Sequence, residues 1–376
     1  MVLSDGKKSF GIYVHIPFCV SKCLYCDFCS FARGEDMMRE YCEELCRRME
    51  RAARACLEYE ADTVYFGGGT PTLLPIECFE RIFSVLRASF SVRDGAEITC
   101  ECNPATADKE YLSRLRALGV NRLSIGLQSS NENELRALGR AHSYAEFRRA
   151  FLDAREAGFD NISADLMYGI PEQTVESFSH TLDELISLSP EHISSYGLKI
   201  EDGTPFARLA HTLALPDEDA EFEMYELLTN RLREHGYAKY EISNFARAGR
   251  ESRHNLRYWY GEEYLGFGVA AHSYFGGERF GNSRDIAAFL RGEDITAERA
   301  CVDADARIEE YIMLRLRLSE GLSLSEYERL AGESIYARCP SLEKFVNNGF
   351  MSVRDGRLAF TDKGFFVSNY ILSELL

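Results

Sequence analysis

Three cysteines stand close together near the N-terminus of this 376-residue chain, where Cys19, Cys23 and Cys26 form the spacing C-x3-C-x2-C. A structural zinc site closes with four protein ligands, and a [4Fe–4S] cluster used only for electron transfer also takes four thiolates. Three thiolates leave one iron of such a cluster open. An open iron can bind the amine and carboxylate of a small molecule and pass one electron into it, and the spacing favours this kind of site.

Two other kinds of site remain open from spacing alone. The last two cysteines form a C-x-x-C pair, as in thioredoxin-like redox motifs, although the preceding Pro17 fits a loop after a strand better than the start of a helix. A zinc site would need a fourth ligand, which Cys29 or His15 could supply. We expect Cys29 to be a peripheral thiol, because as a fourth ligand it would close the cluster.

Composition narrows the class of protein. The net charge of −17 argues against nucleic-acid binding, which needs a basic surface. No apolar run approaches the roughly 20 residues of a membrane span, and residues 1–10 lack the apolar segment of a secretory signal. Twelve cysteines in such a chain indicate a reducing compartment. We therefore expect a cytoplasmic, globular α/β protein without a membrane span.

Short apolar segments alternate with amphipathic stretches over the first two hundred residues. The apolar segments are residues 10–18, 63–66, 97–101, 122–127, 161–168 and 192–200, and the helical stretches between them are 40–54, 77–88, 109–118, 144–157 and 175–188. Alternating strands and helices predict βαβ units and a parallel sheet. Six such strands predict an open, six-stranded partial (β/α) barrel.

The pattern divides the chain into three expected regions. Residues 1–210 are the partial barrel with the cysteine loop, and residues 211–300 extend the barrel. Residues 301–376 are expected to form a helical, winged-helix-like α+β domain with a hairpin turn at Asp355–Gly356. Because this last region is not distinctly basic, a substrate lid or packing module is favoured over a DNA-binding role.

Polar, glycine and metal-ligand residues gather where the predicted strands end. The cysteine loop follows the first strand, Gly67–Thr70 the second, and Glu101, Gln128 and Asp165 lie at the ends of later strands. Barrel enzymes build their active sites at these carboxyl ends.

Two glycine motifs need separate interpretations. Residues 67–70 lack the Gly-Lys-Ser/Thr ending of a phosphate-binding loop, so we expect bare backbone that meets the amino and carboxylate groups of a ligand. Residues 266–271 imitate a dinucleotide fingerprint, but without a clear following helix a tight turn is the better interpretation.

Several motifs together resemble a known family. They are residues 15–26 with the three cysteines, GGGTPT at 67–72, SIGLQ at 124–128, LGR at 138–140 and DLMYGIP at 165–171. This set resembles the radical S-adenosylmethionine (SAM) family of oxygen-independent coproporphyrinogen III oxidase-like proteins, and the resemblance spans almost the whole chain.

The resemblance implies two cofactors and a set of residues around them. Cys19, Cys23 and Cys26 would hold a [4Fe–4S] cluster whose fourth iron takes the SAM amine and carboxylate. The residues that the resemblance assigns to SAM are Tyr13, Tyr25, Gly68, Gly69, Thr70, Glu101, Gln128, Arg140 and Asp165. Arg140 offers a bidentate fork to a carboxylate, and Asp165 can accept two ribose hydroxyl bonds.

Within the family the chain looks most like the HemW branch of haem chaperones. Only twelve residues precede Tyr13, whereas the oxidases carry a long N-terminal segment. Phe28 stands where the oxidases have a further cysteine, and residues 254–259 match the HNxxYW motif of this branch. The resemblance makes His254, with Tyr258 one turn away, the candidate haem ligand.

The branch implies a haem chaperone that delivers haem to acceptor proteins. Its expected partners are haem or a porphyrin, haem-acceptor proteins and a flavodoxin- or ferredoxin-like electron donor, with a homodimer and peripheral membrane contact as further expectations. Two alternatives stay open. One is an oxygen-independent coproporphyrinogen III dehydrogenase using a 5′-deoxyadenosyl radical, and the other is a non-catalytic, metal-stabilised binding protein. Whether the protein is an enzyme is left open.

Overall fold

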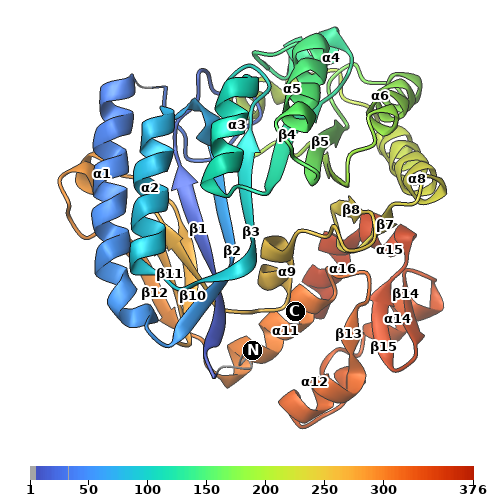
Figure 1. Cartoon of the computed structure of the whole chain (residues 1–376). Coiled ribbons are helices and arrows are strands. Elements are labelled where there is room, and N and C mark those ends of the chain that lie inside the picture. The colour runs from blue at the N-terminus through green and yellow to red at the C-terminus, as the bar shows by residue number, and fades with distance from the viewer. Residues whose placement is uncertain (1–5, 33) are drawn as a thin grey trace.

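The computed structural model describes residues 6–32 and 34–376 and contains one large sheet with a smaller C-terminal one (Figure 1). Six adjacent strands of the large sheet run parallel in chain order. They are β1 (Lys8–Ile16), β2 (Tyr59–Gly68), β3 (Val92–Cys102), β4 (Arg122–Gln128), β5 (Ile162–Tyr168) and β6 (His192–Gly197). The predicted open six-stranded barrel is confirmed, since β1 and β6 pair with further strands and not with each other.

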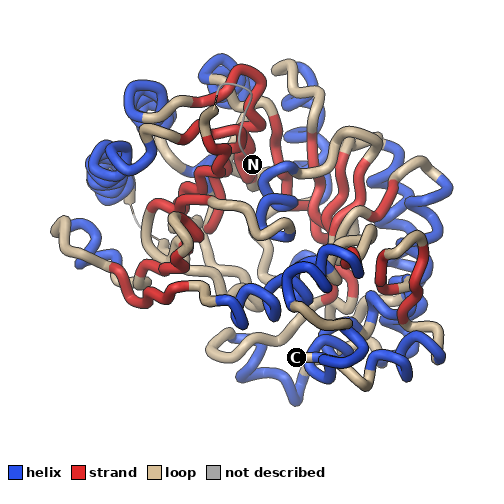
Figure 2. Tube along the Cα trace, turned by 90° about the horizontal axis from the view of Figure 1, so that it is seen from below, coloured by secondary structure: helices blue, strands red, loops and turns tan. Residues whose placement is uncertain are grey.

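Helices cover the outer face of these strands, which follow a curve in the view from below (Figure 2). They are α1 (Glu35–Ala52), α2 (Ile76–Ser89), α3 (Lys109–Leu118), α4 (Glu132–Ala137), α5 (Tyr144–Glu156), α6 (Val175–Ser187), α7 (Pro205–Leu209) and α8 (Glu218–Glu234), with 3-10 turns at Ala53–Cys56, Pro71–Leu73 and Ala210–Thr212. Local signals set several boundaries. Asp108 caps α3, a Ser143–Glu146 capping box begins α5, and Gly119 ends α3 with φ 111°.

Short strands extend the sheet beyond both sides of the barrel. On one side β9 (Tyr264–Phe267) runs parallel to β1, followed by antiparallel β10 (His272–Phe275), β11 (Glu278–Asn282) and β12 (Thr296–Cys301). On the other side β8 (Asn244–Ala246) pairs with β6 and β7 (Ala238–Lys239). Within residues 266–271, the first two end β9 and residues 268–271 form the turn that leads into β10, as expected for a tight turn.

The C-terminal region builds a second hydrophobic core. Its elements are α11 (Ala304–Arg315), α12 (Leu324–Ala331), α13 (Ile335–Arg338), α14 (Leu342–Asn347), α15 (Asp362–Phe366), α16 (Ser368–Leu375), β13 (Leu322–Ser323), β14 (Met351–Arg354) and β15 (Arg357–Phe360). The expected hairpin is present, because β14 and β15 are antiparallel around Asp355 and Gly356, both at positive φ. Together with the helices this small sheet forms the winged-helix-like end of the chain.

Helix α9 (Arg253–Trp259) lies between the sheet and the C-terminal helices (Figure 1), while α10 (Ile286–Leu290) lies beside α1. Buried Arg257 of α9 forms an ion pair with Asp62 of β2 and donates to Ser9 of β1 at 2.7 Å. Glu97 of β3 accepts the backbone N–H groups of Arg253 and His254 at 3.2 and 3.1 Å. These bonds fix α9 against the N-terminal half of the barrel strands.

A membrane span is not found among the described residues. None of the helices within residues 6–32 and 34–376 is both long and apolar enough to cross a bilayer.

Candidate functional site

The cysteine loop leaves the carboxyl end of β1 and closes on itself. The N–H of Phe31 donates to the carbonyl of Pro17 at 2.7 Å, and the N–H of Cys19 donates to the carbonyl of Phe31 at 3.1 Å. The loop is also tied to the end of α4, because the N–H of Leu24 donates to the carbonyl of Leu138 at 3.0 Å. These backbone bonds close the loop, and side chains support it, because Lys22 and Arg284 donate to the carbonyls of Phe28 and Asp27.

Polar groups from neighbouring strand ends reach the three partly exposed thiols. The Thr70 hydroxyl donates to Cys19 Sγ at 3.7 Å, and Arg140 Nη1 donates to Cys23 Sγ at 3.6 Å. Burial raises the pKa of the Cys26 thiol, and the neighbouring Cys23 and Cys19 raise that pKa further. The structure thus places the three predicted ligands on one loop, beside two of the predicted SAM residues, but among the described residues their thiols do not form a group close enough to hold a metal ion as they stand.

Residues 67–70 pack tightly under this loop. A Cβ added to Gly69 would lie 2.6 Å from the Phe18 carbonyl oxygen, and one added to Gly68 would lie 2.5 Å from the His15 ring. The N–H groups of Gly69 and Thr70 donate to the carbonyls of Ile16 and Phe18 at 2.9 and 2.7 Å. The glycines are needed for close packing, and these N–H groups are already used. What this turn can offer a ligand is its carbonyl oxygens, which suit an ammonium group better than a carboxylate.

Glu101 lies directly below the glycine turn. Its carboxylate accepts the Tyr65 hydroxyl at 2.9 Å and the Gly68 N–H at 3.0 Å. Burial raises the pKa of Glu101 to about 7, and the nearby Asp165 carboxylate adds to the rise. Cys100 and Cys102 flank Glu101 along β3 and, because side chains alternate along a strand, face away from it into the hydrophobic core.

Gln128 and Arg140 present buried polar atoms that have no partner. Gln128 ends β4 at φ 64°, and its Oε1 lacks a hydrogen bond among the described residues. Arg140 Nε is likewise buried and unpartnered in the part of the chain that the structure describes. A Cβ at Gly126 would lie 2.9 Å from Arg140 Nη2 and 3.1 Å from Gln128 Nε2, so the glycine makes room for both side chains. Orphaned donors and acceptors of this kind are expected where a polar ligand binds.

Asp165 and Tyr25 complete the polar rim. Asp165 accepts the Ser124 hydroxyl at 3.0 Å, and burial raises the pKa of its carboxyl. Tyr25 packs with Leu138, and burial raises the pKa of its hydroxyl despite the Arg140 guanidinium nearby.

The remaining predicted residues lie deeper in the barrel. The Tyr13 ring stacks on those of Tyr65 and His254, at centroid distances of 6.2 and 6.4 Å. His254 is 1% exposed, and its ring nitrogens are hydrogen-bonded to the hydroxyls of Thr63 and Tyr258, each at 2.8 Å. Burial, together with nearby arginines, lowers the pKa of His254 to about 3, so the ring is neutral.

Neither nitrogen of His254 is free in this arrangement. Haem ligation by His254, with Tyr258 beside it, therefore stays a prediction that requires one of these hydrogen bonds to break. The structure places His254 against the ring of Tyr13, one of the residues predicted to meet SAM.

His15 and Cys29 behave as structural partners of the loop. The Tyr13 hydroxyl is 3.0 Å from His15 Nδ1, and His15 Nε2 is 2.9 Å from the Cys29 carbonyl oxygen. Burial lowers the pKa of His15. Among the described residues, no three His, Cys, Asp or Glu side chains approach closely enough to hold one metal ion. This geometry gives no support to a zinc site built with His15.

Some site residues were not identified from the sequence. Tyr65, Ser124 and Thr63 hold Glu101, Asp165 and His254 through their hydroxyls. Strand alternation could have found the first two, because Tyr65 shares a face with Gly67 and Ser124 shares a face with Gly126.

Comparison with known proteins agrees with this geometry. Residues 13–185 match the Radical SAM superfamily, and residues 302–367 match the HemN C-terminal domain. The heme chaperone HemW of Bacillus subtilis is 36% identical over 97% of this chain and 98% of its own length. The chain belongs to the HemW family. The Escherichia coli HemW relative is 33% identical, over 97% of this chain and 98% of its own length.

A solved structure supports the HemW-type fold. Coproporphyrinogen III oxidase (HemN) from Escherichia coli, described as a radical SAM enzyme, superposes with a TM-score of 0.85 at 24% identity. The match covers 98% of this chain and 90% of that one. At this identity the likeness establishes the shared fold.

The radical SAM match assigns a [4Fe–4S] cluster and SAM to this HemW family member. The residues present fit both groups by their chemistry. Three partly exposed thiols share one loop, and two of them accept from Thr70 and Arg140. Among the described residues, Gln128 and Arg140 each have a buried polar atom without a partner.

Proposed function

We propose that this protein is a haem chaperone that carries a SAM-coordinated [4Fe–4S] cluster and delivers haem to acceptor proteins. Similarity to proteins named heme chaperone HemW over 97% of the chain is the observation that carries the proposal. The HNxxYW residues lie on helix α9, which the buried Arg257–Asp62 ion pair holds in the barrel.

Each strand-end residue has a proposed role toward the cofactors. Cys19, Cys23 and Cys26 hold the cluster, which when bound supplies one electron to SAM. Arg140 orients the SAM carboxylate through its unpartnered buried Nε, which can donate to it, and Gln128 accepts from a ribose hydroxyl through its unpartnered Oε1. The carbonyls at Gly68, Gly69 and Thr70 bind the SAM amine, with Glu101 nearby. Asp165 binds the ribose. Tyr13 and Tyr25 line the cluster and the adenine region.

The remaining partners belong to the same proposal. An electron donor of the flavodoxin or ferredoxin type would approach the cysteine loop, where Val20 and Phe28 are 61% and 62% exposed and Lys22 adds positive charge. We place the protein in the cytoplasm, since its twelve cysteines are all free thiols. A homodimer and peripheral membrane contact are kept as proposals.

An anaerobic assay on the reconstituted full chain tests the function. Haem-loaded protein is mixed with an apo-haem protein, and transfer is followed from the Soret bands of donor and acceptor. We expect transfer that is faster with the reconstituted protein than with the Cys23→Ser variant or with free haem. Conversion of coproporphyrinogen III to protoporphyrinogen IX in the same preparation would overturn the chaperone-only proposal in favour of the oxidase.

A further inference from the structure

A buried arginine lies at the start of β4 without a partner. Arg122 is 2% exposed, and its side chain forms no hydrogen bond or ion pair with any other residue that the structure describes. Thr99, its register partner on β3, is buried, and the Thr99 hydroxyl is also unpartnered among the described residues. A guanidinium stays charged, and a buried charge is costly when no opposite charge compensates it. Arg122 therefore needs a counter-charge that acts on it from a distance.

The strand register places Arg122 between two carboxylates of the SAM site. Side chains alternate along a strand, so Arg122 shares one face of β4 with Ser124. Ser124 pairs in register with Glu101 of β3 and donates its hydroxyl to Asp165 of β5 at 3.0 Å. Because β4 lies between β3 and β5, Arg122 stands between the strands that carry the two carboxylates.

Both carboxylates respond to the charge of Arg122. Burial raises the pKa of Glu101 to about 7 and Asp165 raises it further, whereas Arg122 lowers it. Burial also raises the pKa of Asp165, and hydrogen bonds from two serines, together with Arg122 and Arg140, lower it. The two carboxylates disfavour each other's ionisation, so one positive charge between their strands stabilises both ionised forms at once.

The other groups that face Arg122 and the two carboxylates do not change charge near pH 7. Burial lowers the pKa of His254 to about 3 and that of His192 well below its usual value, so both rings are neutral. Glu97 of β3 already accepts the N–H groups at the start of α9. Burial keeps the surrounding phenols neutral by raising the pKa of each of Tyr13, Tyr65, Tyr196, Tyr240 and Tyr258.

We propose that Arg122 is a positioning residue of the SAM site, the shared counter-charge that keeps Glu101 and Asp165 ionised without touching the cofactor. The inference rests on the proposed roles of these carboxylates toward SAM. An ionised Asp165 can accept from two ribose hydroxyls, and an ionised Glu101 attracts the positive amine. Arg140 cannot replace Arg122 in this role, because the carboxylate of SAM engages Arg140 in the same proposal.

The pH dependence of SAM binding tests the proposal. The anaerobically reconstituted full chain is titrated with SAM by calorimetry from about pH 6 to about pH 9, which brackets the pKa of Glu101. Arg122→Met removes the charge, so both carboxyls should hold their protons to higher pH than in the wild type. A rise of about one unit in a carboxyl pKa makes the dissociation constant about tenfold higher at the acidic end, and the difference should vanish at the alkaline end.

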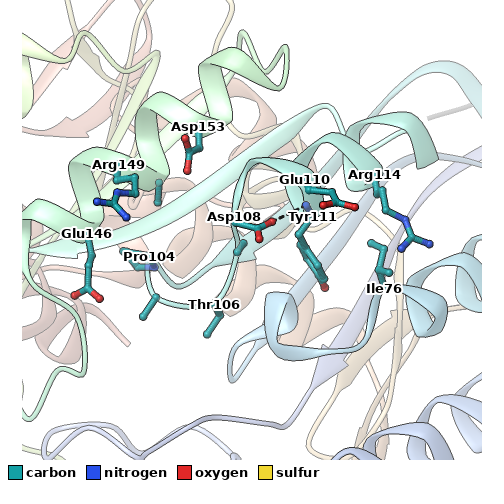
Figure 3. Close-up of a pocket in the computed structure, with 13 residues that line it drawn as sticks. Ile76, Pro104, Thr106, Asp108, Glu110, Tyr111, Arg114, Glu146, Arg149 and Asp153 are labelled. Atoms are coloured by element: carbon teal, nitrogen blue, oxygen red, sulfur yellow. Dashed lines mark hydrogen bonds between the residues drawn. The ribbon is translucent and has the colours of Figure 1, made fainter.

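Three further variants separate charge from shape. Arg122→Lys keeps a positive charge and should regain part of the affinity at low pH. In a Glu101→Gln background, Arg122→Met should have a smaller effect, because one of the two carboxylates is gone. The matched control is Arg149→Met, since Arg149 is exposed on α5 in a groove of about 530 Å³ between α3 and α5 (Figure 3), and binding should be unchanged at every pH.

Infrared titration of the apo chain gives a readout that needs no cofactor. The protonated-carboxyl band that disappears in Glu101→Gln belongs to Glu101, and it should persist to higher pH in Arg122→Met than in the wild type. Thermal unfolding shows whether each variant is folded, and neutral Arg122→Gln replaces Arg122→Met if that variant is not.

Two kinds of failure are distinguishable. A loss of SAM affinity that is equal at every pH, or an unchanged infrared midpoint, overturns the counter-charge role of Arg122 and leaves the SAM site standing. A wild-type chain that does not bind SAM overturns the roles proposed for the two carboxylates, while the infrared midpoints still decide whether Arg122 controls their ionisation.

Discussion

Gln128 adopts an unfavourable backbone conformation at its position in the site. A φ of 64° is uncommon for a residue other than glycine, and such conformations concentrate where function demands a particular side-chain direction. At this residue the register between β4 and β5 also shifts. The result is an amide that points beside Arg140 with Oε1 unpartnered among the described residues. Strain and an unsatisfied atom coincide at one position.

The roles of the four cysteines in the loop can be separated by substitution. Cys29 is 6% exposed, and its own carbonyl accepts from the His15 ring, so we expect Cys29→Ser to retain the cubane absorption after anaerobic reconstitution. Cys23→Ser removes a ligand and should lose that absorption together with most of the bound iron. Equal loss in both variants would show that Cys29 is a fourth ligand.

The Glu101 carboxyl makes stability depend on pH. Its pKa is raised from 4.5 to about 7 in the folded protein, so its contribution to stability is complete below pH 4.5 and is lost as pH rises through 7. The glutamine of Glu101→Gln does not ionise, so this variant does not lose stability as the pH rises. Relative to the wild type, the variant should gain on the order of 3 kcal/mol in free energy of unfolding across that window.

Urea unfolding of apo wild type and Glu101→Gln, at several pH values between 4.5 and 8, measures this difference. The surface variant Glu43→Gln serves as the control. Parallel pH profiles for wild type and Glu101→Gln would contradict the burial of an ionisable carboxyl at this position.

Sequence reasoning reached some of these residues and not others. Strand alternation is enough to place Glu101 on the face of β3 opposite to Cys100 and Cys102. It could not place His254, because the surroundings of that ring come from Thr63 and Glu97 on strands far away in the chain. Local pattern contains no information on such long-range contacts.

The glycine turn that follows β2 supports the cysteine loop that follows β1. Gly67–Thr70 supports the cysteine loop through two backbone hydrogen bonds and through the absence of Cβ atoms. The motif therefore acts on the cluster ligands by packing as well as by any contact with SAM.

Gly69→Ala should damage the loop. The new Cβ would lie 2.6 Å from the carbonyl oxygen and 2.9 Å from the nitrogen of Phe18, and backbone cannot yield as a flexible side chain does. We expect about 1–3 kcal/mol of destabilisation and a lower iron content after reconstitution. Gly34→Ala is the matched control, because a Cβ there meets nothing within 4 Å. Equal iron content in both variants would contradict the packing role.

The strands and helices of the barrel were predicted well because they are long and periodic. Residues 211–300 were expected to extend the barrel, but the individual strands β7 to β12 were not predicted, since they have two to six residues and little alternation. They form only because the barrel ends in two open edges: β9 pairs with β1 and β8 pairs with β6.

At the scale of the whole molecule, two hydrophobic cores share one helix. Met224 and Leu228 of α8 belong to the barrel core, whereas Tyr225 of the same helix belongs to the C-terminal core. Tyr168 of β5 packs against both. The C-terminal core therefore rests on α8 and β5, away from the cysteine loop.

This arrangement predicts separate responses to cavities in the two cores. Ile312→Ala and Leu166→Ala each remove a fully buried side chain, at a cost of about 2–5 kcal/mol. Ile312→Ala should lower the thermal midpoint and keep the reconstituted cluster, while Leu166→Ala, next to Asp165, should lower both. Circular dichroism and cluster absorbance follow the two properties. Simultaneous loss of both in Ile312→Ala would show that the cores unfold as one unit.

The closure of the cysteine loop affects how the protein can lose and regain its cluster. Backbone bonds from Phe31 to Pro17 and from Leu24 to Leu138 form the loop from protein groups alone. Because these bonds do not involve the cluster ligands' sulfur atoms, we expect the loop to stay attached to β1 and α4 when the cluster is lost. Renewed supply of iron and sulfide would then restore the cluster without refolding of the barrel.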